Sequence, residues 1–332
     1  MEDVWRASLT RVCIFGVLVY ILFWKSLCVD AGVPALCDSA RISINNYETK
    51  TRSVASFCRT TEEGFSMNGA QRWCWGALEA KPPAVRATFV WAPWWQIIQD
   101  FLRTGGRLAV QTFARRSFYN GVAIVSHDKF ERALPLFRKL GINRIFTPSA
   151  KRGVRCAGIE VIPILFNPLV KTSPARHKDI LYSFVGSPAY PIRKAVFGLS
   201  RRDDVVLINR ENRFFRLSSQ ARTSLTAEFA DILSRSRFAL CPAGATPLTF
   251  RISESLWAGA IPVIIADNLE LPCGVDWEDL VVCTKEKDVK SLDRIIRNIS
   301  PEREKKMRDA CLALARTLEQ DPAYFIRAYF SK

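Results

Sequence analysis

The stretch RFALCPAGATPLTFRISESLWAGAIPVIIAD, residues 237–267, has the pattern of two buried strands with a helix between them. The runs RFALC (237–241) and IPVII (261–265) are short and apolar, as buried strands are. Residues 248–259 between them predict a helix that ends at Gly259. A strand, a helix and a second buried strand in succession predict a parallel sheet with a helix packed on one face.

The first turns of this helix carry charged residues at the edge where such sheets bind ligands. The loop PAGATP (242–247) follows the carboxyl end of the first strand, which is the ligand edge of a parallel sheet. Free N–H groups at a helix start favour an anion such as a diphosphate, and Arg251 can add a bidentate phosphate contact. Glu254 lies one turn later on the same face, where its carboxylate can accept hydrogen bonds from ribose hydroxyls. The alternative is an ordinary salt bridge between Arg251 and Glu254 on an exposed helix.

The same alternation of strands and helices extends over most of the chain. Strands are predicted near 41–47 and at 86–92, 121–126, 143–147, 159–165, 180–186, 204–208 and 279–283, and helices at 94–103, 128–141, 191–200, 225–236, 287–298 and 301–319. Residues 30–80 otherwise look irregular, and a link rich in proline and charge spans 167–179. Two α/β blocks joined by a link predict two Rossmann-like domains facing a cleft.

The predicted organisation has four parts. Residues 1–29 form a cytoplasmic tail with a signal anchor or a signal peptide, 30–84 a stem and the start of the N-terminal domain, 85–170 the N-terminal domain, and 171–332 the C-terminal domain. The apolar run VCIFGVLVYILFW (12–24) is short for a membrane span but extends to Val29 if Lys25 snorkels. A type II signal anchor, a cleaved signal peptide and a buried helix all fit this run.

The composition narrows the possible partners. The net charge of +16 favours anionic partners such as nucleic acid, an anionic membrane or a phosphate-bearing substrate. No motif interleaves basic and aromatic residues as single-strand nucleic-acid binders do, so nucleic acid is not an expected partner. The ten cysteines include no C-x-x-C pair and the chain has only two histidines, so no metal site is predicted. Cys37, Cys58 and Cys74 are candidates for disulfides, whereas Cys241, Cys273 and Cys283 are expected to be small buried hydrophobes.

The segments SRFALCPAG, TFRISESLWAGAIPVIIADNLELP and VDWEDLVV resemble the signature of the exostosin family, glycosyltransferase family 47. Upstream, KDILYSFVGSPAYPIRKAVF resembles the family's strand–glycine–arginine block, with Gly186 and Arg193 in the matching places, and GIEVIPILFNP resembles the block before it. The segments ATFVWAPWW and GVAIVSHDKF resemble the first domain more loosely. The resemblance covers roughly 85–330 and is strong in the second half and weak in the first.

This resemblance implies an α/β fold of GT-B type, with the nucleotide-sugar donor in the C-terminal domain and the acceptor mainly in the N-terminal one. It implies an inverting glycosyltransferase that uses a UDP-sugar and a glycan acceptor, with no metal or other cofactor. It also implies a single-pass type II Golgi protein, anchored through residues 12–29, with a lumenal catalytic domain. A soluble secretory protein after signal cleavage is the alternative, and a homo-oligomer or a hetero-oligomer with another transferase is compatible with both.

By the same resemblance, Arg193 and Arg251 contact the diphosphate, Glu254 holds the ribose, and Gly186 and Gly244 let the backbone approach the nucleotide. The full predicted donor set is Gly186, Arg193, Pro242, Gly244, Thr249, Arg251 and Glu254.

Inverting transfer also needs a base for the acceptor proton, and Asp128 and His127 at the carboxyl end of a predicted strand are the candidates. Asp128 also suits a helix N-cap, and His127 also suits a structural role.

Two departures from the family pattern favour an alternative function. Ala243 stands where the family has arginine, which removes a charge-assisted bond of about 1.5–3 kcal/mol if that arginine contacts phosphate. Arg213, Arg216 and Arg222 are candidates to replace it. The segment GGRLAV (105–110) also lacks the family's Asp-His pair. The alternatives are an altered donor specificity and a catalytically inactive exostosin-like protein that binds glycan or a partner transferase.

Overall fold

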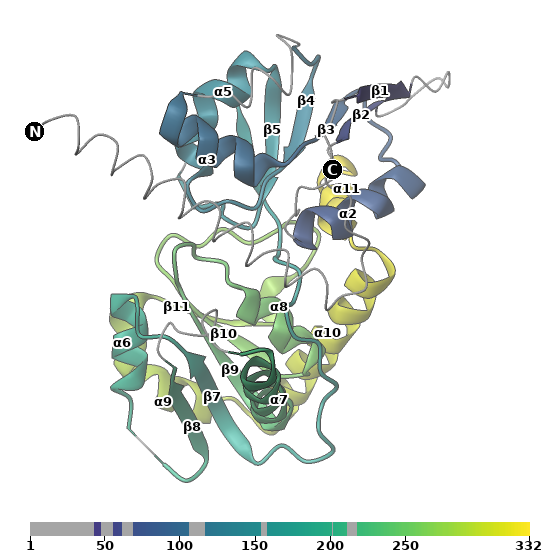
Figure 1. Cartoon of the computed structure of the whole chain (residues 1–332). Helices are drawn as coiled ribbons and strands as arrows, with labels where there is room; N and C mark the ends of the chain where they lie inside the picture. Colours follow the sequence, from purple (N-terminus) through teal and green to yellow (C-terminus); the bar gives the residue numbers. More distant parts are fainter. Residues whose placement is uncertain are drawn as a thin grey trace, which may run out of the picture. The chain divides into compact units, whose positions relative to one another are not determined.

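The structure is a computed structural model, and it describes residues 43–47, 56–61, 69–105, 117–153, 158–200, 202–210 and 218–332. The described elements form two sheets, one of six strands and one of five (Figure 1).

The first sheet has its strands in chain order. They are β1 (Ser43–Tyr47), β2 (Ser56–Thr61), β3 (Thr88–Trp91), β4 (Gly121–Ile124), β5 (Ile142–Thr147) and β6 (Glu160–Pro163). β1 pairs antiparallel with β2, and the other four pairings are parallel. An antiparallel edge strand on an otherwise parallel sheet is a common arrangement, and it differs from the fully parallel sheet expected here.

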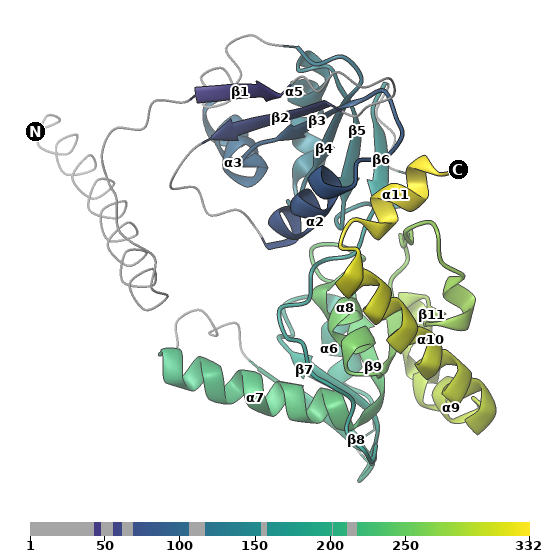
Figure 2. The same cartoon turned by 90° about the vertical axis from the view of Figure 1, so that its right-hand side faces the viewer.

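Helices cover both faces of the first sheet (Figure 2). The helices α2 (Gly69–Ala80) and α11 (Tyr324–Phe330) cover one face, and α3 (Trp94–Thr104), η1 (Phe130–Ala133) and α5 (Leu134–Lys139) cover the other. Successive side chains of a strand point to opposite faces, so Phe89 packs in the core under α2 while Val90 packs under α3. Because β3 and β4 pair in parallel, their carboxyl ends lie at the same edge of the sheet, beside the start of α3.

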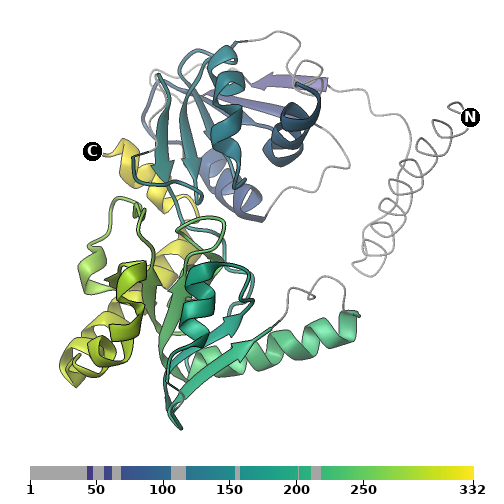
Figure 3. The same ribbon diagram turned by 90° about the vertical axis from the view of Figure 1, so that its left-hand side faces the viewer.

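The second sheet is entirely parallel and has the order β11-β10-β9-β7-β8. Its strands and helices are drawn in teal, green and yellow in Figure 3. Its strands are β7 (Ile180–Gly186), β8 (Val205–Asn209), β9 (Ser236–Pro242), β10 (Ile261–Ile265) and β11 (Val282–Thr284). The chain runs from β7 outward to β8, returns to β9 on the other side of β7, and continues outward to β10 and β11. This reversal makes the β7–β9 boundary a topological switch point, where open α/β sheets bind ligands at the carboxyl ends of their strands.

Helices also cover both faces of the second sheet. α7 (Ser219–Arg235), α8 (Phe250–Trp257) and α10 (Pro301–Gln320) pack on one face, and α6 (Pro191–Phe197), η4 (Glu286–Ser291) and α9 (Leu292–Arg297) pack on the other. η3 (Trp277–Asp279) precedes β11. In β9, Ala239 and Cys241 face the first group while Phe238 and Leu240 face the second. Coverage on both faces explains why these strands are continuous apolar runs.

Two partly buried basic side chains bind backbone carbonyls at the amino edge of this second sheet. The Lys178 ammonium donates to the carbonyls of Ser234 (2.7 Å), Ser236 (2.9 Å) and Ala258 (3.0 Å), near the ends of α7 and α8. Helix ends leave carbonyls without intrahelical partners, so one lysine satisfies groups from both helices. Arg308 of α10 donates in the same way to the carbonyl of Gly259 (2.7 Å). These hydrogen bonds tie the helix ends together at the amino edge, and the ligand edge lies at the opposite end of the sheet.

The predicted α/β class with two Rossmann-like sheets is confirmed, but the prediction of an irregular stretch over 30–80 is wrong in part. β2 and α2 lie in that stretch, and α11 was not predicted either. α2 forms because Cys74, Trp75 and Leu78 line one helical face and bury it against the first sheet. The four-part division of the chain stays a prediction, and residues 1–42 lie outside the described part.

The cysteines behave differently from one another. Cys74, a candidate for a disulfide, is a free buried thiol, and Cys37 lies outside the described residues. Cys241 is buried as expected, whereas Cys283 is exposed because β11 is the edge strand of its sheet. Among the helices that the structure describes, none is both long enough and apolar enough to cross a bilayer.

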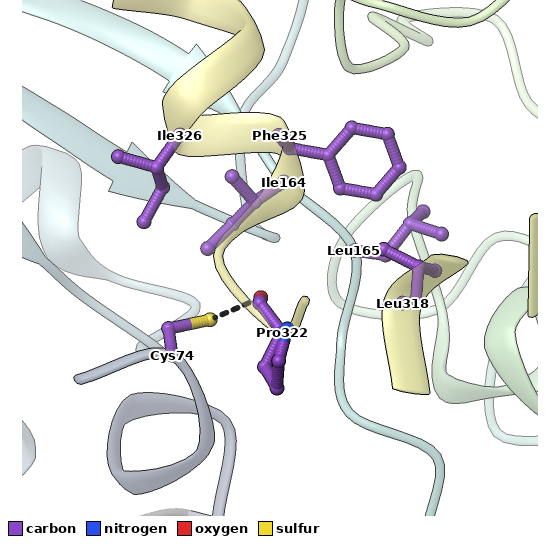
Figure 4. Close-up of a pocket in the computed structure, with 7 residues that line it drawn as sticks. All are labelled: Cys74, Ile164, Leu165, Leu318, Pro322, Phe325 and Ile326. Atoms are coloured by element: carbon purple, nitrogen blue, oxygen red, sulfur yellow. Dashed lines mark hydrogen bonds between the residues drawn. The ribbon is translucent and has the colours of Figure 1, made fainter. Parts of the chain in front are cut away.

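A small cavity lies where α10 gives way to α11 (Figure 4). Its volume is about 10 Å³, and its lining is Cys74, Ile164, Leu165, Leu318, Pro322, Phe325 and Ile326. The Cys74 thiol donates to the carbonyl of Pro322 (3.1 Å). A space that holds about one water molecule and is lined by apolar groups is a packing void rather than a substrate site.

Candidate functional site

The predicted donor residues gather at the switch point between β7 and β9. β7 ends at Gly186 and the neighbouring β9 ends at Pro242, so both lie at the carboxyl edge of the sheet. The loop after β9 is tight, because the Gly244 amide donates to the carbonyl of Thr246 (3.1 Å). A Cβ at Gly244 would lie 2.8 Å from Nη2 of Arg193, so a larger residue there would displace the guanidinium. The glycine is needed for the arginine to occupy its place.

Arg193 comes from the first turn of α6 and reaches the loop after β9. Its Nε donates to the carbonyl of Ala243 (3.2 Å), and its Cζ lies 5.3 Å from the centre of the Tyr190 ring. Burial lowers the pKa of Arg193, and the positive charge of Arg251 lowers it further. The guanidinium groups of Arg193 and Arg251 are therefore close enough to repel each other. An anion between them would relieve this repulsion.

Arg251, in the first turn of α8, is held between an aromatic pair and a carboxylate. Its Cζ lies 4.3 Å from the centre of the Phe229 ring and 5.7 Å from that of Phe184, distances at which a cation is attracted by the ring face. A Cβ at Gly186 would lie 2.8 Å from the tip of the Phe184 ring. Gly186 therefore leaves room for the ring beside the guanidinium, a role that differs from the predicted approach of backbone to nucleotide.

Glu254 forms the predicted pair with Arg251, with 3.3 Å between Arg251 Nε and Glu254 Oε2. The alternative of an exposed helix pair is wrong about burial, because Glu254 is only 4% exposed. Burial raises the pKa of Glu254, whereas the charge of Arg251 and hydrogen bonds from the backbone amides of Val170 and Leu169 oppose this rise. The link between the two sheets thus supplies amides to the carboxylate. A carboxylate accepts about four hydrogen bonds, so Glu254 keeps capacity for a ligand donor.

Thr249 stands at the N-cap of α8 but does not cap it. Its backbone is extended, as at an N-cap, and its side chain makes no capping hydrogen bond. Its Oγ1 is buried and has no hydrogen-bond partner within the described part of the chain. A buried hydroxyl without a partner costs about 1–3 kcal/mol, so a ligand oxygen would stabilise this position. The hydroxyl lies two residues before Arg251, at the positive end of the helix dipole.

The Cys241 thiol, at the end of β9 near this group, is not a reactive nucleophile. Burial raises the pKa of Cys241 to about 12, so the side chain remains a neutral thiol at physiological pH. Thiolate nucleophiles need a lowered pKa, so Cys241 is a packing residue. The arrangement as a whole can bind an anion with two guanidinium groups, a helix N-terminus and a hydroxyl, beside a carboxylate that accepts hydrogen bonds.

Asp128 and His127 form a second group, at the carboxyl edge of the first sheet after β4. His127 is 2% exposed, its Nδ1 accepts the Lys129 amide (2.9 Å), and its Nε2 lies 2.9 Å from the side-chain amide of Gln99. Burial lowers the pKa of His127 more than the nearby Asp128 carboxylate raises it. The ring is therefore neutral with both nitrogens engaged, whereas the Asp128 side chain is 45% exposed and lies 3.3 Å from Nδ1. In the described residues, no hydrogen bond or ion pair joins this group to the donor group.

None of the three arginines predicted to replace the family's missing arginine is placed in the donor group among the described residues. Arg213 and Arg216 lie outside the described residues, and Arg222 of α7 lines an open groove with Val170 and Lys171. The described residues hold no group of three or more His, Cys, Asp or Glu side chains able to bind a metal ion. Sequence reasoning missed Phe184, Phe229 and Tyr190, which flank the arginines. The only signal for them was the aromatic residue three positions before Arg193 in YPIR.

The comparisons with known proteins agree with this location. Residues 154–299 match the family model described as the exostosin GT47 domain, which confirms the resemblance for the part of the chain that carries the donor group. The probable beta-1,4-xylosyltransferase IRX10L of Arabidopsis thaliana is 39% identical over 95 residues, which are 28% of this chain and 22% of that protein. The probable glucuronosyltransferase 47 A of Physcomitrium patens is 38% identical over 95 residues, 28% of this chain and 20% of that protein.

This chain therefore matches only about a fifth of the length of these curated relatives. Among solved structures, Anabaena Alr3699/HepE in complex with UDP and glucose is similar with a TM-score of 0.41 and 14% identity. That match covers 78% of this chain and 80% of the Anabaena chain.

Proposed function

We propose that this protein is an inverting glycosyltransferase that moves a sugar from a UDP-sugar to a glycan acceptor. The observation that carries the proposal is the pair of guanidinium groups, Arg193 and Arg251, at the switch point beside the unpartnered hydroxyl of Thr249. The matched exostosin GT47 domain contains this group, and the relatives are named xylosyltransferases and glucuronosyltransferases.

In this proposal the diphosphate lies between Arg193 and Arg251, at the start of α8. The helix N–H groups and the Thr249 hydroxyl would complete the anion site. Glu254, held by Arg251 and the two link amides, would accept hydrogen bonds from the ribose hydroxyls. The same contacts would stabilise the UDP leaving group, because negative charge develops on the diphosphate as the bond to the sugar breaks.

Asp128 is the proposed base. In an inverting displacement, the acceptor oxygen forms a bond to the anomeric carbon, the bond to UDP breaks, and a base takes the acceptor proton. The Asp128 carboxylate is exposed and is not paired with a lysine or arginine in the described part of the chain. His127 is neutral and bound on both nitrogens, so it is not available to remove the proton.

Replacing Asp128 by Asn is expected to lower kcat by roughly 10²- to 10⁴-fold, the usual effect of losing a general base. The affinity for UDP should stay unchanged, because Asp128 does not contact the donor group. Steady-state transfer assays and UDP titrations measure the two quantities. Asp203→Asn, which alters an exposed carboxylate in the turn before β8, is the matched control. A variant with wild-type kcat would assign the base elsewhere.

The setting of the reaction is also proposed. Residues 12–29 would anchor the protein in the Golgi membrane as a single-pass type II protein with a lumenal catalytic part, or be cleaved to leave a soluble secretory form. The apolar run between Arg11 and Lys25 and the resemblance to the exostosin family support this. The family resemblance likewise supports transfer without a metal, and a homo-oligomer or a pairing with another transferase.

The experiment that tests the function is a donor screen on the full chain. UDP-xylose, UDP-glucuronic acid, UDP-galactose and UDP-arabinose would each be mixed with xylo-oligosaccharides, with UDP release and the anomeric configuration of the product as readouts. Release of UDP with an inverted product supports the proposal. Ala243, in place of the family's arginine, favours the inactive alternative, which predicts glycan or UDP binding without turnover of any donor.

A further inference from the structure

An exposed tryptophan stands beside the proposed base. Trp95 is 44% exposed, and it is one of four large apolar residues that are exposed in the described part of the chain. It lies in the first turn of α3, directly after β3, at the carboxyl edge of the first sheet. The neighbouring Trp94 is instead fully buried and packs against Phe137. The two adjacent indoles therefore have different roles, and packing explains only the buried one.

The indole of Trp95 packs against the imidazole of His127, which is held in place. Its centroid lies 5.8 Å from that of the His127 imidazole, with 38° between the planes. His127 cannot turn freely, because the Lys129 amide and the Gln99 side chain hold its two nitrogens. A platform that is already ordered loses little entropy when a ligand stacks on it.

Asp128 flanks the same imidazole. Its carboxylate lies 3.3 Å from His127 Nδ1 and is 45% exposed. An exposed aromatic face and an exposed hydrogen-bond acceptor therefore lie beside the same imidazole. This combination matches a sugar, which has C–H groups on the faces of its ring and hydroxyls at its rim. The C–H groups are weakly positive and the face of an indole is negative, so the two attract each other.

We propose that Trp95 is the platform on which the acceptor sugar stacks, with its reacting hydroxyl directed to Asp128. The acceptor class follows from the flat platform. Pyranose units whose hydroxyls are equatorial, such as β-1,4-linked xylose or glucose, have axial C–H groups on both faces and can lie flat on an indole. This inference rests on the proposed function for its catalytic meaning, but the stacking itself can be measured without turnover.

The test uses the full chain as wild type, Trp95→Leu, Trp95→Phe and Tyr119→Leu. Tyr119 is a matched control, because it is 84% exposed and lies just before β4, at the opposite edge of the sheet from Trp95. Binding of β-1,4-xylohexaose and β-1,4-cellohexaose would be measured by calorimetry without donor. The acceptor KM and kcat would be measured with the active donor from the screen, and UDP affinity would be measured for every variant.

Trp95→Leu is expected to raise the dissociation constant and the acceptor KM of the better oligosaccharide by roughly tenfold. Trp95→Phe should recover part of the loss, while kcat changes less than KM and UDP affinity stays at the wild-type value. Equal oligosaccharide affinity in wild type and Trp95→Leu would overturn the inference, as would an equal loss in Tyr119→Leu. A wild-type chain that binds UDP but neither oligosaccharide would also overturn it and leave the proposed function standing. Oligosaccharide binding through Trp95 without any UDP binding would instead refute the proposed function alone.

Discussion

Replacing Arg251 by alanine is expected to weaken UDP binding roughly 100-fold, because the change removes a charge-assisted contact of about 1.5–3 kcal/mol from the diphosphate. The loss extends beyond that contact. Glu254 is buried and Arg251 is its counter-ion, so the variant leaves a carboxylate whose pKa is already raised by burial without that support. A protonated Glu254 would accept hydrogen bonds from the ribose less well. Transfer activity should fall at least in proportion to donor affinity.

The control for this prediction is Arg235→Ala, which makes the same change of charge within the same sheet unit. Arg235 pairs with Asp179 and Asp231 at the end of α7, near the amino end of β9 and away from the ligand edge. Titration calorimetry with UDP on wild type and both variants, with thermal unfolding of the free proteins, separates binding from folding. If Arg251→Ala binds UDP as tightly as wild type does, the diphosphate is not held at the start of α8.

Replacing Glu304 by glutamine is expected to cost about 3–5 kcal/mol of stability, the range found when one partner of a buried ion pair is removed. Glu304 is 7% exposed and lies on α10. Its carboxylate accepts hydrogen bonds from Nε of Arg237 (3.0 Å to each oxygen), from Nη2 of Arg237 and from Nη2 of Arg308. The charge of Arg308 lowers the pKa of the nearby Lys178, and the charge of Glu304 raises it. Without the carboxylate, Arg237 and Arg308 would lose their shared counter-ion, and Lys178, whose pKa burial and Arg308 lower to about 7, would lose a nearby charge that opposes this shift.

Thermal unfolding measures this effect, and a fall of roughly 10 °C in the apparent Tm corresponds to the expected loss. Asp309→Asn is the matched control on the same helix. Asp309 pairs with Lys305, and both side chains are more than half exposed, so its loss should cost less than about 1 kcal/mol. Glu304→Gln with a Tm like that of Asp309→Asn would show that the network does not stabilise the fold.

The second sheet could be predicted from sequence because its strands are buried on both faces. Runs such as IPVII at 261–265 are apolar at every position, and the periodic helices between them fix the parallel order of a βαβ chain. The pair of Arg251 and Glu254 followed from the same local rule, since residues three apart share a helix face. The resemblance to exostosins then pointed to Arg193.

Features that depend on the path of the chain through space could not be predicted. The amides of Leu169 and Val170 reach Glu254 only because the link between the sheets passes α8, and no local pattern records that path. The contact of Arg193 with Ala243 joins residues that are 50 positions apart. α11 is seven residues long, too short for a periodic signal, and it forms because Phe325 and Ile326 are buried in a hydrophobic cluster with residues from distant parts of the chain, such as Phe89 and Trp277. Tertiary packing overrides weak local propensity in such elements.

We propose that the group at the switch point binds the diphosphate of UDP. The most direct test is the unfolding temperature of the full wild-type chain with UDP and, separately, with uridine. UDP at about 100 times its dissociation constant should stabilise the protein by about 2.7 kcal/mol. Uridine lacks the diphosphate and should stabilise it far less at the same concentration. No stabilisation by UDP, or equal stabilisation by uridine, would contradict the assignment of Arg193, Thr249 and Arg251 to a diphosphate site.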